Sequence, residues 1–106
     1  MATIKEDYCS QEVYRLLREK GFNGEIHTTF DGEGYTRPSI THQMAMKWLR
    51  EVHGIYIVFF HTNKSGWWYN ITDMRDSYVF YSSEKIMCPY EEVVDLAIKY
   101  TLENLI

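Results

Sequence analysis

The clearest pattern in the chain lies in residues 41–60, where the apolar positions change from a helical to a strand spacing at Gly54. Before Gly54, apolar side chains recur at the i, i+3, i+4 and i+7 positions that line one face of a helix. After it, residues 55–60 are apolar or aromatic at every position, which is typical of a strand covered on both faces. We therefore expect a helix over residues 41–53 that ends at the glycine. The expected buried positions of this helix are Ala45, Trp48, Leu49 and Val52.

Weaker patterns predict a helix near each end of the chain. Thr3 and Glu6 match a capping box, so the first helix is expected from Thr3 to Lys20. Pro89 suits the first position of a last helix, because its missing N–H costs nothing there. The apolar stripe of the first helix is Cys9, Val13, Leu16 and Leu17, and that of the last helix is Val93, Val94, Ala97, Ile98, Thr101, Leu102 and Leu105.

Strand patterns separated by polar turns predict an antiparallel sheet in the second half of the chain. A further short segment, residues 25–30, could add an edge strand. We expect one α+β domain spanning residues 1–106, an antiparallel three- to four-stranded meander packed with three helices in the order α-(β)-α-β-β-β-α. The three meander strands are expected at residues 55–62, 67–72 and 77–81, with turns at 63–66 and 73–76.

Composition narrows the classes of function. The chain has 106 residues and a formal net charge of −4, which disfavours nonspecific nucleic-acid binding because that needs clustered lysine and arginine. No apolar stretch approaches the roughly 20 residues that span a bilayer, and the N-terminal residues lack the apolar run of a signal peptide. We therefore expect a cytosolic protein with no membrane partner. Cys9 and Cys88 are expected to be reduced and to pack as small apolar residues.

No catalytic, metal-binding or nucleotide-binding motif accompanies the predicted core. His42 and His53 share a helix face but stand about 16 Å apart at 1.5 Å per residue, so they cannot bind one ion together. Neither a zinc-finger nor a zincin spacing occurs. The sequence predicts no catalytic residue, no metal ligand and no cofactor, and we do not expect an enzyme.

The aromatic content offers the one functional lead, because both faces of the predicted sheet are apolar. Aromatic residues make up 16% of the chain, more than two or three helices easily cover. If the helices cover one face only, the other face is a candidate interface, since large exposed apolar patches commonly mark binding sites. An alternative is that the first helix covers this second face, although its stripe is narrow. The candidate interface residues are Tyr56, Val58, Phe60, Trp68, Tyr78 and Phe80.

Two functional hypotheses follow. The first is a small protein-interaction domain of unknown biochemical function whose simplest partner is a second copy, forming a homodimer. The alternative is single-stranded nucleic-acid binding through an aromatic sheet face. The neighbouring turns disfavour the alternative, because they offer Lys64 and Arg75 together with Asp73 and Asp76. Its stacking residues would be Trp67, Trp68, Tyr69 and Tyr78.

Two segments also resemble a known group of proteins. Residues 43–55, QMAMKWLREVHGI, and the C-terminal segments 90–92, 97–100 and 102–106 are similar to small uncharacterised proteins of anaerobic gut bacteria and of their phages and mobile elements. The resemblance implies a phage or mobile-element setting. It implies no activity and supplies no catalytic residues.

Overall fold

The computed structural model describes residues 7–30, 34–62 and 66–106. Within these residues, three helices and five strands follow one another in the order α-β-β-α-β-β-β-α. The predicted α+β class with an antiparallel meander is confirmed. The elements are α1 (Gln11–Glu19), β1 (His27–Phe30), β2 (Thr36–Ser39), α2 (His42–His53), β3 (Ile55–Thr62), β4 (Gly66–Asp73), β5 (Val79–Ser82) and α3 (Tyr90–Asn104).

The strands form two separate sheets. β3, β4 and β5 make the antiparallel meander, with β4 in the centre and a register that runs from Ile55 opposite Asp73 to Thr62 opposite Gly66. β1 and β2 form a two-stranded hairpin in which His27 lies opposite Ser39. The short strand expected within residues 25–30 therefore exists, but it pairs with β2 and is not a fourth strand of the meander.

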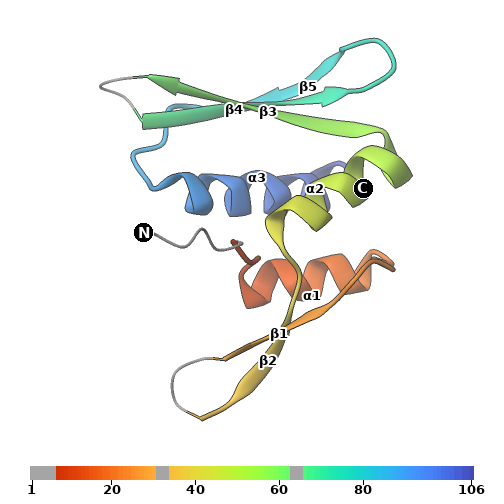
Figure 1. Ribbon diagram of the computed structural model, residues 1–106. Helices are drawn as coiled ribbons and strands as arrows, with labels where there is room; N and C mark the ends of the chain where they lie inside the picture. Colours follow the sequence, from red (N-terminus) through yellow and green to blue (C-terminus); the bar gives the residue numbers. More distant parts are fainter. Residues whose placement is uncertain (1–6, 31–33, 63–65) are drawn as a thin grey trace, which may run out of the picture.

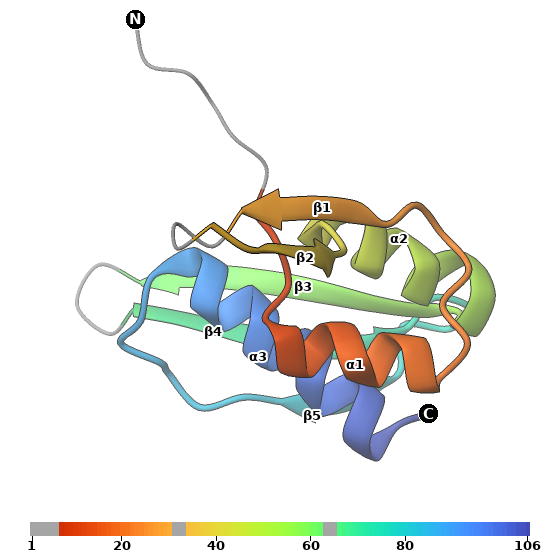
Figure 2. The ribbon, with the colours of Figure 1, turned by 90° about the horizontal axis from the view of Figure 1, so that it is seen from below.

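The elements stack in layers, with α3 in the middle. Figure 1 shows the β3–β4–β5 sheet on one side of the molecule, α2 and α3 beneath one of its faces, and α1 on the far side of α3. Figure 2, seen from below, shows α1 alongside α3 and the β1–β2 hairpin beside α2. Leu105 lies half-buried beyond the end of α3, but the six stripe residues within α3 are buried by this arrangement, with none more than 1% exposed. These residues are Val93, Val94, Ala97, Ile98, Thr101 and Leu102.

Helix α2 begins and ends where the sequence predicts. The Thr41 side chain accepts a hydrogen bond from the Met44 N–H at 3.2 Å, which caps the first turn. Gly54 ends the helix in the left-handed conformation, with φ of 67°. Val52 is 57% exposed, so its assignment to the buried face is wrong. The chain turns at Gly54, and Ile55 is buried after the turn.

Helix α1 begins later than expected. Thr3 and Glu6, the expected capping box, lie outside the described residues. The helix begins at Gln11, where the Ser10 side chain caps it by accepting from the Val13 N–H. The segment before it is extended, because the Cys9 N–H donates to the Ile40 carbonyl at 2.9 Å and so pairs this segment with the chain entering α2. In residues 7–10, backbone pairing takes the place of the expected helix.

Two glycines with positive φ allow a test of this packing. Gly54 and Gly66 have φ of 67° and 78°, where a side chain costs about 1–2 kcal/mol. A Cβ at residue 54 would meet no atom within 4 Å, whereas one at residue 66 would collide with the Ile86 carbonyl oxygen. We expect Gly66→Ala to lower the free energy of unfolding by more than Gly54→Ala does, measured by urea denaturation. Equal losses would contradict the close approach of residue 86 to β4.

Candidate functional site

The sheet register places Tyr56, Val58, Phe60, Trp68 and Phe80 on one face, opposite to the face that α2 and α3 cover in Figure 1. Tyr78 precedes β5 and joins this face through its ring contact with Phe80. The alternate residues of β3 and β4 point toward the helices instead. Among these, Ile57, Tyr69 and Ile71 are buried. α1 does not cover the opposite face, because it packs against α3. We call this face the outer face; its apolar members are Tyr56, Val58, Phe60, Trp68, Tyr78, Val79 and Phe80.

Four of the five rings of the outer face are arranged in two pairs. Phe60 and Trp68 lie opposite each other on β3 and β4, and their rings stack with centroids 4.1 Å apart and planes 15° apart. Tyr78 and Phe80 meet edge to face, with centroids 5.4 Å apart. Tyr78 is 62% exposed and Phe80 is 41% exposed. The outer face therefore presents preordered aromatic surface to the solvent.

The polar side chains of the outer face bond within the sheet. The Ser82 hydroxyl donates to Asn70 Oδ1 at 2.6 Å, and the Thr72 hydroxyl donates to the Tyr56 carbonyl at 3.0 Å. No Lys, Arg, Asp or Glu occupies an outer-face position of β3, β4 or β5. The strand positions of this face are consequently uncharged, and the Thr72 and Ser82 hydroxyls already donate within the sheet.

A β-bulge corrects the predicted facing of β5. Strict alternation along residues 77–81 groups Val79 with Tyr81 and so predicts an inner-face position for both. Tyr81 does face inward, where its ring stacks on Tyr100 of α3 at 3.9 Å. Val79, however, lies opposite Thr72 on the outer face, because the register shifts between Ile71 and Thr72 and places an extra residue on β5. A strand of four residues is too short for its alternation to reveal such a shift.

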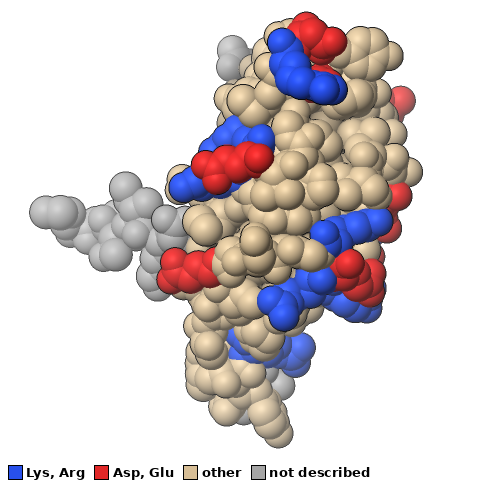
Figure 3. Space-filling model, turned by 90° about the vertical axis from the view of Figure 1, so that its right-hand side faces the viewer, with Lys and Arg blue, Asp and Glu red and all other residues tan. Residues whose placement is uncertain are grey.

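The stacking residues of the nucleic-acid hypothesis do not share one face. Tyr69 is buried, and Trp67 packs inward against Tyr90 of α3 with ring centroids 4.6 Å apart, which leaves Trp68 and Tyr78 on the outer face. On the side of the molecule seen in Figure 3, basic and acidic side chains alternate, and at the sheet layer they lie side by side. Arg75 is paired with Asp73 at 2.9 Å. On the side seen in Figure 3, the described residues therefore supply no basic stripe for a phosphate backbone.

The fold also assembles a polar cluster that sequence reasoning missed. Cys9 precedes α1, His42 opens α2 and Asp95 lies in α3, and one ligand-type atom from each lies within 4.8 Å of the others. His42 Nε2 is 3.2 Å from Asp95 Oδ1, and the Ser10 N–H donates to the same oxygen at 2.9 Å. Residues 53 positions apart meet here, and no local spacing signals it.

Burial and hydrogen bonding set the protonation of this cluster. Burial alone would raise the pKa of Asp95, but the hydrogen bonds from His42 and Ser10 outweigh it and lower the pKa below its ordinary value. Burial, aided by the negative charge of Asp95, raises the pKa of the Cys9 thiol to about 12. At neutral pH the cluster therefore holds a carboxylate beside a protonated thiol.

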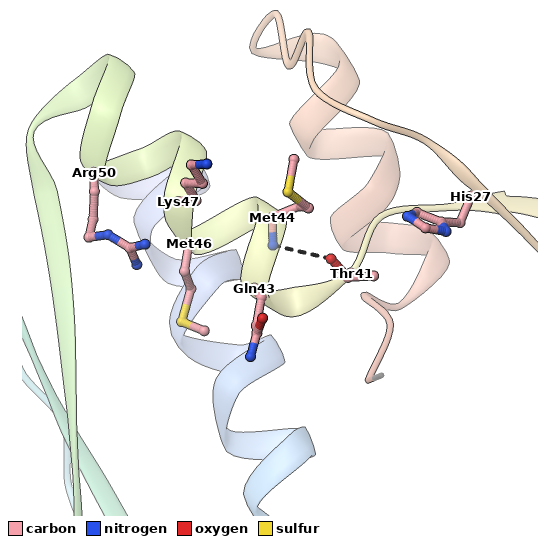
Figure 4. Close-up of a pocket in the computed structure, with 7 residues that line it drawn as sticks. All are labelled: His27, Thr41, Gln43, Met44, Met46, Lys47 and Arg50. Carbon is pink, nitrogen blue, oxygen red and sulfur yellow. Dashed lines mark hydrogen bonds between the residues drawn. The ribbon is translucent and has the colours of Figure 1, made fainter. Parts of the chain in front are cut away.

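Surface cavities lie beside α2, and one of them borders the polar cluster. One, of about 420 Å³, has His42 and Asp95 in its wall, together with Asp7, Tyr8, Ser10, Glu91, Glu92 and Leu96. A larger one, of about 570 Å³, runs along α2 beside His27. Figure 4 shows its side chains directed to different sides of α2, with His27 standing apart on β1. They do not converge on a point where a substrate could react.

No family model, curated protein or solved structure matches the chain. The α+β class is therefore assigned from the structure alone, and the phage or mobile-element setting stays a prediction of the sequence resemblance. In the described part of the chain, no helix has the length and apolar character to cross a bilayer.

The lowered pKa of Asp95 predicts a pH-dependent stability. A depressed carboxyl pKa stabilises the fold above the ordinary value of about 3.9, and this contribution is lost as pH falls through the folded pKa. We expect Asp95→Asn to cost about 1.5–3 kcal/mol at pH 7, the range for hydrogen bonds to charged groups. The difference from wild type should shrink at pH 3, measured by denaturant unfolding in EDTA.

The matched control is Glu103→Gln, at an exposed position of the same helix. It should change the free energy of unfolding little at either pH. A wild-type advantage over Asp95→Asn that is as large at pH 3 as at pH 7 would contradict the assigned role of the carboxylate.

Proposed function

We propose that the protein is a small interaction domain that self-associates through its outer face. The observation that supports this most is the uncovered aromatic surface on β3, β4 and β5, which none of the three described helices packs against (Figure 1). Tyrosine, tryptophan and phenylalanine are enriched in protein interfaces, because they supply large contact areas at a low entropic cost. A binding role, without catalysis, fits a face that carries rings and no reactive group.

A second copy is the partner that the charge distribution favours. The chain carries a formal net charge of −4, so two copies repel through most of their surfaces. The outer face carries no formal charge, and its Asn70, Thr72 and Ser82 side chains bond within the sheet. Two outer faces can therefore meet across a twofold axis without bringing charged strand residues together.

The size of the outer face predicts a weak dimer. β3 and β4, of eight residues each, span about 26 Å, and the three strands together are about 10–15 Å wide, which gives a footprint of at most roughly 260–390 Å² because β5 has four residues. A standard stable interface buries about 800 Å² per partner. We therefore expect a dissociation constant in the micromolar range rather than a permanent dimer.

The cytosolic setting belongs to the same proposal. Cys9 is buried and Cys88 half-buried, and both are free thiols. Free thiols of this kind persist in reducing compartments, which supports a cytosolic location. The phage or mobile-element setting is implied by the sequence resemblance alone.

The test is the solution mass over a concentration series from about 1 to several hundred micromolar, by analytical ultracentrifugation. Wild type should pass from monomer to dimer. Phe60→Asp places a charge beside Trp68 in both copies, so we expect it to weaken the dimer at least tenfold, which corresponds to about 1.4 kcal/mol.

Val52→Asp is the matched control, because Val52 is exposed on α2 and lies away from the outer face. It should dimerise as wild type does, and thermal unfolding of each variant checks that it is folded. A wild type that stays monomeric throughout the series would refute the proposal. Salt-sensitive quenching of tryptophan fluorescence by a single-stranded oligonucleotide, in a monomeric wild type, would favour the nucleic-acid alternative.

A further inference from the structure

We propose that Cys9, His42 and Asp95 form a binding site for one divalent zinc-class cation. The inference does not depend on self-association, because the cluster lies on the helical side of the molecule and the outer face on the other. It rests on the convergence of three ligand types from three segments that only the fold brings together.

The spacing of the ligand atoms suits such an ion. Zinc binds nitrogen and oxygen ligands at about 2.0–2.1 Å, so two such ligands at a tetrahedral angle stand about 3.3 Å apart. His42 Nε2 and Asp95 Oδ1 are 3.2 Å apart. The Cys9 sulfur is the third ligand atom, and all three atoms lie within 4.8 Å of one another. Small side-chain rotations can bring them to bonding distance of one metal ion.

The chemistry of the ligands selects among metals. A thiolate, an imidazole and a carboxylate together suit a borderline ion such as zinc, whereas magnesium and calcium take oxygen ligands. A thiolate and a carboxylate would neutralise the two charges of the ion. Binding exchanges the Cys9 proton for the metal and releases that proton to solvent.

The surroundings supply support and access. The Ser10 N–H holds the Asp95 carboxylate at 2.9 Å, which is the kind of outer contact that orients a metal ligand. His42 and Asp95 line the wall of the 420 Å³ cavity, so an ion can reach them from solvent. Glu91 and Glu92, in the same wall, attract a cation toward the cavity, and a water molecule can take its fourth position.

Bound metal would fasten the segment before α1, the start of α2 and the middle of α3 to one another. These three segments are far apart in sequence, so the ion would act as a cross-link of the helical layer. We therefore expect zinc to raise the thermal unfolding temperature of the wild-type protein.

The test is titration of the metal-free protein with cobalt(II) as a spectroscopic probe, followed by displacement with zinc against a chromophoric chelator. We expect one ion per chain and a cobalt–thiolate charge-transfer band in the near ultraviolet. Cys9→Ser should abolish the band and weaken cobalt binding by more than about 100-fold. This loss exceeds the effect of removing a residue that contacts only a metal ligand. Asp95→Asn should weaken binding while it keeps an acceptor for the Ser10 N–H.

Cys88→Ser is the matched control, because the chain has two cysteines and this variant leaves Cys9 as its one thiol. It should bind cobalt with the same band as wild type. The control keeps the test decisive even if Cys9→Ser does not fold. The proposal is overturned if metal-free wild type binds no ion, if the Cys88→Ser adduct lacks the band, or if Cys9→Ser binds as tightly as wild type.

Discussion

Burial of α3 is the constraint on which the rest of the structure depends. Its apolar residues extend over more than one face of the helix, so a single neighbour cannot cover them. The sheet covers one side through β4, and α1 and α2 cover others. Each fully buried valine, isoleucine or leucine contributes roughly 1.5–3 kcal/mol to the free energy of folding. The other helices therefore stabilise the fold most where they surround α3. No described helix is then left for the outer face.

This arrangement explains why the two proposed sites lie on different sides of the molecule. The outer face is exposed because the helices gather on the inner side of the sheet, and its exposed rings follow from that packing. The Cys9–His42–Asp95 cluster lies where three segments meet around α3, since the Cys9 N–H pairs with Ile40 and Ser10 with Asp95. One is a broad neutral surface suited to a protein, and the other is a small polar cluster suited to an ion.

The sequence predicted those features that depend on neighbouring residues. The change from helix to strand at Gly54 could be predicted because the periodicity of apolar residues and the left-handed glycine are local properties. The outer face was largely predictable for the same reason, since β3 and β4 alternate regularly. Val79 was missed because the bulge depends on pairing with β4, and the start of α1 because residues 7–10 pair with a distant segment. His42 and Asp95 meet through tertiary packing, which no spacing in the chain encodes.

The central claim is that the outer face contacts a second copy, and residue-resolved NMR at increasing protein concentration tests it most directly. Two-dimensional spectra should show concentration-dependent shifts for outer-face residues of β3, β4 and β5, such as Phe60, Trp68 and Phe80. Signals from α1 and the β1–β2 hairpin should stay unchanged. Spectra that do not change with concentration, or changes confined to the helical side, would contradict the claim.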